Sequence, residues 1–164
     1  MLLPQNRLIM MKRILTIAVL LLLTLNTFAQ LTVNDEGVYI NKENKPFTGS
    51  YIERYPNNQV KIEINLKDGH LDGKYITYFE SGQINEIRTY RNGKMDNRWE
   101  TFNEHGAKTA EANFNNGKKH GKWYVWDEKG TLRYDMSYTN GERSGIWIIY
   151  NEAGEVISEK NYDQ

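Results

Sequence analysis

The chain has no cysteine among its 164 residues, and this absence excludes several kinds of covalent link and site. Without cysteine there is no disulfide, no thiolate metal site, no nucleophilic thiol and no lipid-anchored cysteine after a leader peptide. Basic and acidic residues balance at 21 each. No clustered basic surface of the kind that binds nucleic acid is encoded. Because disulfides and thiolate metal sites are excluded, packing and strand pairing must stabilise the fold.

Long apolar runs are also missing, except for one near the N-terminus. Lys12 and Arg13 precede an apolar run of 12 residues, 14–25, and small residues follow at Thr27 and Ala29. This order predicts a secretory signal peptide, residues 1–29. A membrane anchor is the weaker alternative, because a helix needs about 20 apolar residues to span a bilayer.

Cleavage of this peptide would leave residues 30–164 with a net charge of −3, since the loss of Arg7, Lys12 and Arg13 leaves 18 basic residues against 21 acidic ones. Met11 is an alternative start of the chain, because two basic residues follow it directly. The predicted location is periplasmic, outer-envelope or secreted. The negative charge disfavours attraction to anionic lipid.

Residues 30–48 form a lead-in to the rest of the chain. Val38 to Ile40 predicts a short strand, and the polar stretch that ends at Pro46 predicts a turn. We expect this segment to cover the first edge of a sheet as an edge strand. A partly ordered terminus is the alternative.

From Gly49 the sequence repeats every 24 residues. The five copies are residues 49–72, 73–96, 97–120, 121–144 and 145–164. Positions within a copy are numbered here from offset 0, and twelve of the 13 glycines fall at offsets 0, 9 and 20. The glycines at offset 0 are Gly49, Gly73, Gly121 and Gly145. Asparagine, the non-glycine residue that best tolerates a left-handed backbone, replaces glycine at Asn97 and Asn58, so both sites predict positive φ.

Each copy predicts a β-hairpin. Offsets 1–6 are aromatic and β-branched, and offsets 11–17 alternate in polarity, most clearly from Val60 to Leu66. Glu-x-Gly loops such as Glu104–Gly106 join the strands within a copy, and Asn-Gly turns such as Asn140–Gly141 join neighbouring copies. No helical periodicity follows the leader. The predicted fold is all-β: an antiparallel meander of about ten strands in a single curved, elongated sheet.

Two columns of aromatic residues run through the copies. Offset 2 carries Tyr51, Tyr75, Trp99, Trp123 and Trp147, and offset 5 carries Tyr78, Phe102, Trp126 and Tyr150. The two offsets differ by an odd number, so their side chains point to opposite faces of a regular strand. We interpret the offset-2 column as a structural ladder. For the offset-5 column, which Arg54 interrupts in the first copy, a binding surface and a second ladder are both open.

Residues that could carry chemistry are scattered. The histidines His70, His105 and His120 occupy unrelated offsets in predicted turns, which does not favour a metal site. Glutamates recur at offset 7, but a catalytic pair needs carboxylates in different environments. No phosphate-binding loop or nucleophile elbow is present. The sequence predicts a protein that is not an enzyme and that uses no cofactor and no metal.

One copy shows the recurring pattern in full: Gly121, Trp123, Trp126, Gly130, Tyr138 and Gly141. This pattern resembles the MORN-repeat-variant family, the bacterial relatives of the membrane occupation and recognition nexus repeats. The resemblance covers residues 49–162 and departs from the family at Arg54 and Asn97. It implies a curved sheet of hairpins and a role in protein–protein or membrane-associated scaffolding. Some bacterial relatives are antitoxin or immunity proteins, and the family supplies no catalytic residues.

The leading functional prediction is an exported, non-catalytic repeat scaffold that binds another protein in the cell envelope. One alternative is an antitoxin or immunity protein that neutralises a partner toxin. A further alternative is a membrane- or glycan-associated binding module, which is not favoured. Nucleic acid is not an expected partner. The sequence leaves the partner and the oligomeric state open.

Overall fold

The computed structural model describes residues 31–163, and all of its regular structure in that range is β. Within these residues, no helix exists that would be long and apolar enough to cross a membrane. The predicted signal peptide, residues 1–29, lies outside the described residues.

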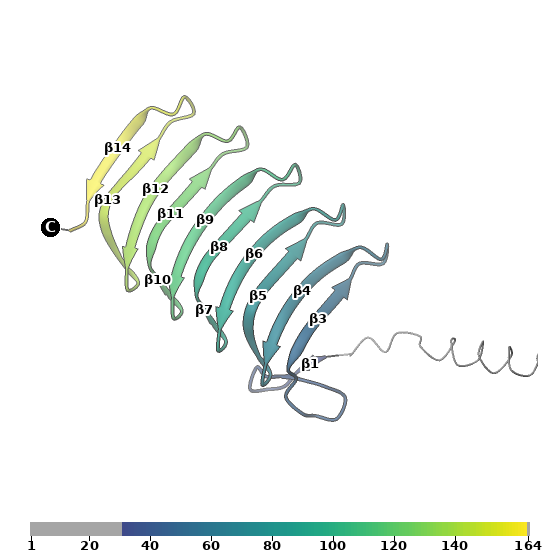
Figure 1. Ribbon diagram of the computed structural model, residues 1–164. Helices are drawn as coiled ribbons and strands as arrows, with labels where there is room; N and C mark the ends of the chain where they lie inside the picture. Colours follow the sequence, from purple (N-terminus) through teal and green to yellow (C-terminus); the bar gives the residue numbers. More distant parts are fainter. Residues whose placement is uncertain (1–30, 164) are drawn as a thin grey trace, which may run out of the picture. The chain divides into compact units, whose positions relative to one another are not determined.

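The repeats form one antiparallel sheet in which neighbouring strands follow chain order (Figure 1). Its main strands are β3 (Gly49–Arg54), β4 (Val60–Lys67), β5 (His70–Tyr78), β6 (Ile84–Arg91), β8 (Asn97–Phe102), β9 (Lys108–Asn115), β11 (Gly121–Trp126), β12 (Leu132–Thr139), β13 (Glu142–Tyr150) and β14 (Val156–Asn161). Short strands β7 (Lys94–Met95) and β10 (Lys118–Lys119) extend the pairing of β6 and β9. The strands are bowed along their length (Figure 1), and the predicted curved meander is confirmed.

The loop inside each copy closes on a β-bulge. In the fourth copy, Gly130 N donates to Asp127 O at 3.0 Å, and Gly130 has φ of 82°. The register then shifts by one residue between Val125 and Trp126. The four turns between copies have positive φ at both central residues, as type I′ turns require. Local turn chemistry therefore sets the hairpin geometry of every copy.

Offset 0 has a left-handed backbone even where glycine is absent. Asn97 has φ of 63°, and Asn58, at offset 9, has φ of 69°. Both predictions of positive φ are confirmed. The short polar side chain of asparagine makes this conformation less costly than other side chains would.

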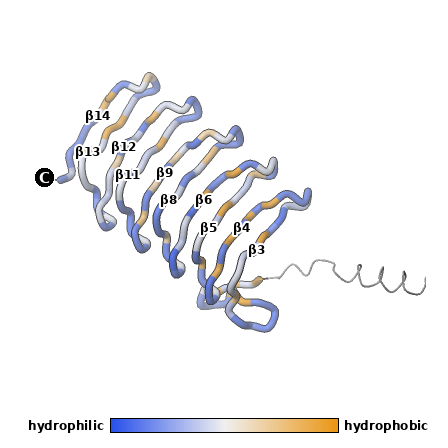
Figure 2. Tube along the Cα trace, viewed as in Figure 1, coloured by the Kyte–Doolittle hydropathy of each residue, from blue (hydrophilic) through white to orange (hydrophobic). Residues whose placement is uncertain are grey.

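The core lies on one face of the sheet and is thin. Its buried apolar side chains are Ile64, Leu66, Ala112 and Phe114. Pairing of Ile64 with Tyr51, and of Ala112 with Trp99, places this core on the side of the offset-2 aromatics. Apolar residues are concentrated within the strands, whereas the turns are hydrophilic (Figure 2). A single layer of strands buries its side chains mainly against their own neighbours on the same face.

The lead-in does not extend the sheet, contrary to the expectation of an edge strand. β1 (Thr32–Val33) pairs with β2 (Tyr39–Ile40) in a separate two-stranded sheet. The side chains of Asn34 and Asn41 each accept two backbone N–H groups, which folds the segment onto itself. The lead-in thus forms local turns and its own two-stranded sheet instead of pairing with β3.

The lead-in is attached instead to the first turn between copies. Tyr39 N donates to Gly69 O at 2.8 Å, and Gly69 N donates to Phe47 O at 2.8 Å. β3 consequently pairs with β4 alone and remains at the edge of the sheet.

Candidate functional site

The pairing register places the two aromatic columns on opposite faces. In β11, Trp123 pairs with Met136, whereas Trp126 pairs with Leu132 beyond the bulge. Tyr124 and Trp126 contact each other with 5.6 Å between ring centroids, so they share the second face. The face that carries the offset-2 column is named the ladder face. The face that carries Tyr78, Phe102, Trp126 and Tyr150 is named the strip face.

On the ladder face, aromatic rings at offsets 2 and 17 alternate in one continuous series. Centroid distances are 5.9 Å for Trp99–Phe114, 5.2 Å for Phe114–Trp123, 5.1 Å for Trp123–Tyr138, 5.2 Å for Tyr138–Trp147 and 4.9 Å for Trp147–Tyr162. The indole nitrogens of Trp123 and Trp147 donate to Asn113 O and Ser137 O, which fixes both rings. These contacts support the structural interpretation of the offset-2 column.

A cation joins the first part of the ladder to the rest. The guanidinium of Arg88 lies 5.5 Å from the centre of the Tyr75 ring and 4.9 Å from that of Trp99. Its charge is paired with Glu86 at 2.8 Å, and Glu86 also accepts the indole N–H of Trp99. The sequence analysis did not predict this cluster. Its signal was the charged residue Arg88 at a strand position that pairs with an aromatic residue of the ladder, Tyr75.

The ladder face also has a hollow that the sequence analysis did not predict. It has a volume of about 130 Å³ and lies between Trp99 and Trp123. Ala110 and Ala112 line it, at offsets 13 and 15, where the next copy has Tyr134 and Met136. The two small side chains leave space between the neighbouring tryptophan rings. Its lining is apolar and suits an apolar side chain rather than a polar ligand.

The strip face carries the predicted binding residues in one row. Tyr78, Phe102, Trp126 and Tyr150 end β5, β8, β11 and β13, and all four are half-buried. Each pairs across a bulge with offset 11, which holds Ile84, Lys108, Leu132 and Val156. Ile84 is 37% exposed and Val156 is 55% exposed. The two offsets together form a strip beside the loops that is apolar except at Lys108.

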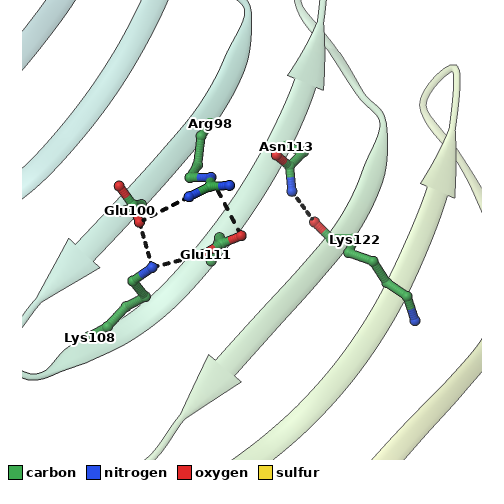
Figure 3. A network of polar contacts seen from close by, with 6 residues as sticks. All are labelled: Arg98, Glu100, Lys108, Glu111, Asn113 and Lys122. Atoms are coloured by element: carbon green, nitrogen blue, oxygen red, sulfur yellow. Dashed lines mark hydrogen bonds and ion pairs between the residues drawn. The ribbon is translucent and has the colours of Figure 1, made fainter.

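A charged network lies next to this strip (Figure 3). Lys108 donates to Glu100 and Glu111, and Arg98 lies 3.9 Å from Glu100 and 3.6 Å from Glu111. The hydrogen bond with Glu100, followed by that with Glu111, raises the pKa of Lys108 above its usual value. In the next copy, Lys122 pairs with Asp135 at 2.7 Å. These charges are satisfied within the sheet and form a polar border to the strip.

The three histidines are exposed, at the start of β5, in a loop and beside β10. The glutamates at offset 7, namely Glu80, Glu104, Glu128 and Glu152, are exposed in the loops. Over residues 31–163, no group of three or more His, Asp or Glu side chains is placed to hold a metal ion.

Comparison with known protein families identifies the repeat. The model of the MORN repeat variant matches residues 47–68, 71–92, 119–140 and 143–164, which is 88 of the 164 residues. The unmatched stretch between residues 92 and 119 contains most of the third copy, where Asn97 replaces glycine, yet the hairpin of β8 and β9 is present there. No curated protein matches the chain in sequence.

Proposed function

The chain belongs to the MORN repeat variant family, and on that basis we propose that it is a non-catalytic scaffold that binds another protein through its strip face. The observation that carries this proposal is the aromatic row of Tyr78, Phe102, Trp126 and Tyr150, beside the exposed side chains of Ile84 and Val156. Rows of this kind on a protein surface serve as contact sites for partners.

The composition of the strip face favours a protein as the partner. Protein interfaces combine an aromatic centre with a polar, solvated rim. Trp126 and Tyr124 supply an aromatic pair with a tilted ring contact, and the network around Lys108 supplies polar groups beside the row. The row crosses successive strands of four copies, so a partner that runs along the sheet would meet the same chemistry in each copy.

Export forms the second part of the proposal. The basic residues, the apolar run and the small residues before Gln30 are typical of a cleaved signal peptide. The partner is then a protein of the cell envelope or of the extracellular space. A toxin of the cytoplasm would be out of reach of the exported chain.

Affinity capture from envelope extract tests the binding. The bait is the protein purified from cells that express the full chain, so that any processing has occurred. Trp126→Ala combined with Tyr150→Ala should abolish recovery of a saturable partner. Tyr134→Ala is the matched control, because Tyr134 is also a large aromatic residue at the surface, 41% exposed, but lies on the ladder face of the copy that holds Trp126.

Unchanged recovery with the double variant, together with loss in the control, would place the interface on the ladder face and refute the strip. The absence of any saturable partner would refute the scaffold itself. Export is tested separately by the mass of the purified chain. A mass that corresponds to Gln30 as first residue supports it, and an intact leader in the cytoplasmic fraction contradicts it.

A further inference from the structure

Both edges of the sheet lack a second neighbouring strand. β3 and β14 each have a single neighbour in the sheet. Every residue of β14 is exposed, with Val156 at 55% and Ile157 at 62%, whereas β12, the matching strand one copy earlier, is mostly half-buried. β14 therefore lacks the neighbouring strand that covers β12.

All junctions between neighbouring copies share one register. Offset 14 of one copy pairs with offset 3 of the next: Glu63 with Ile76, Ile87 with Glu100, Glu111 with Tyr124 and Asp135 with Ile148. In the last copy offset 14 is Glu159, on β14. In the first copy offset 3 is Ile52, on β3. The two edges are thus the two halves of one more junction of the same kind.

The charges at these edges are complementary in that register. Across the first junction, the hydroxyl of Tyr78 at offset 5 donates to Glu63 at offset 14, at 3.3 Å. The last copy has Glu159 at offset 14, and the first copy has Arg54 at offset 5. Arg54, the one exception in the aromatic column, would then face Glu159 and form an ion pair.

The aromatic ladder would continue across the same junction. Tyr138 at offset 17 contacts Trp147 at offset 2 of the next copy, at 5.2 Å between centroids. In the equivalent position, Tyr162 of one molecule would meet Tyr51 of another. The lead-in is attached at Gly69 and leaves β3 without a second partner strand in the described part of the chain.

We propose that β14 of one molecule pairs antiparallel with β3 of a second copy, in the register of the internal junctions, so that copies assemble head to tail. The interface joins two different surfaces, so each added copy presents a new free edge. Unless the curvature of the sheet closes a ring, the assembly is open-ended and its mean size grows with protein concentration.

Sedimentation velocity over a concentration series, with protein purified from cells that express the full chain, tests this assembly. Glu159→Arg and Arg54→Glu, each alone, should weaken association about tenfold, because an attractive cross-strand pair becomes a repulsive one. The double variant, and an equimolar mixture of the two single variants, should regain association, because each junction then pairs opposite charges. Circular dichroism confirms that every variant is folded.

Association should also weaken with added salt, since the ion pair lies at the surface. A protein that stays monomeric at every concentration overturns the proposal. So does association that neither single variant weakens, which would point to pairing of two β14 strands or of two faces. A double variant that associates no better than the single variants would show that Glu159 and Arg54 do not meet.

Discussion

Phe114 and Trp123 contact each other with 5.2 Å between ring centroids, and this contact joins the third copy of the repeat to the fourth. Phe114 also contacts Trp99 within its own copy, and Trp123 also contacts Tyr138. Every ring in this part of the ladder is therefore shared between two neighbours. Such coupling between adjacent copies is what makes a repeat array fold cooperatively.

Trp123→Ala should lower the free energy of unfolding by about 3 kcal/mol. The value lies at the low end of the range for buried Trp, because Trp123 is only half-buried. The change removes two ring contacts and the hydrogen bond to Asn113 O. Urea unfolding, followed by circular dichroism, measures the loss.

Tyr134→Ala is the control for this prediction, because Tyr134 lies on the same face of the same copy but is 41% exposed and belongs to no ring contact of the ladder. It should cost clearly less than Trp123→Ala. Equal costs for the two variants would mean that the ladder does not carry the stability of the sheet.

The repeat period made much of this fold predictable. Once Trp123 and Tyr138 recur at fixed offsets, strand parity alone places them on one face. The hollow could not be predicted in this way, because it is lined by Ala110 and Ala112, which no other copy repeats. The position of the lead-in depends on Gly69, a residue far along the chain whose backbone binds Tyr39. Features that depend on residues that differ between copies, or on contacts with segments outside the copies, therefore cannot be predicted from the repeat.

Gly130→Val should destabilise the protein by about 2 kcal/mol through the backbone alone. Gly130 has φ of 82°, and a Cβ atom there would meet nothing within 4 Å. Gly130→Asn should cost much less, because asparagine tolerates the left-handed region. Thermal unfolding of both variants gives the comparison. Similar costs for valine and asparagine would contradict a backbone origin.

Gly69→Ala should detach the lead-in while the repeats stay folded. A Cβ atom at Gly69 would overlap Val38 Cγ1 and lie 2.9 Å from Tyr39 O, so the lead-in has to move. Hydrogen exchange should then increase at the amide of Tyr39, which donates to Gly69 O, and at the amide of Phe47, which donates to Tyr39 O. Gly141→Ala is the control, since it has a similar turn with nothing within 4 Å of the added atom. Unchanged exchange at Tyr39 in Gly69→Ala would show that the lead-in is not held there.

Lys108→Met should destabilise the protein at neutral pH and lose this effect in alkali. Lys108 neutralises Glu100 and Glu111, and the hydrogen bond with Glu100, then that with Glu111, raises its pKa. A raised pKa in the folded state means that the charged form stabilises the fold below the unfolded-state pKa of about 10.4. This stabilisation is lost as pH rises through the higher pKa of the folded state.

The difference in unfolding free energy between the original protein and Lys108→Met should therefore be constant from neutral pH to about pH 10 and then shrink. Urea unfolding at a series of pH values measures it. Lys129→Met is the control, because its ion pair with Glu152 is 3.7 Å long and both side chains are about three-quarters exposed, at 75% and 76%. Exposed pairs contribute little, so this variant should match the original protein at every pH. A difference for Lys108→Met that persists unchanged far into alkali would show that Lys108 acts through the packing of its stem and not through its charge.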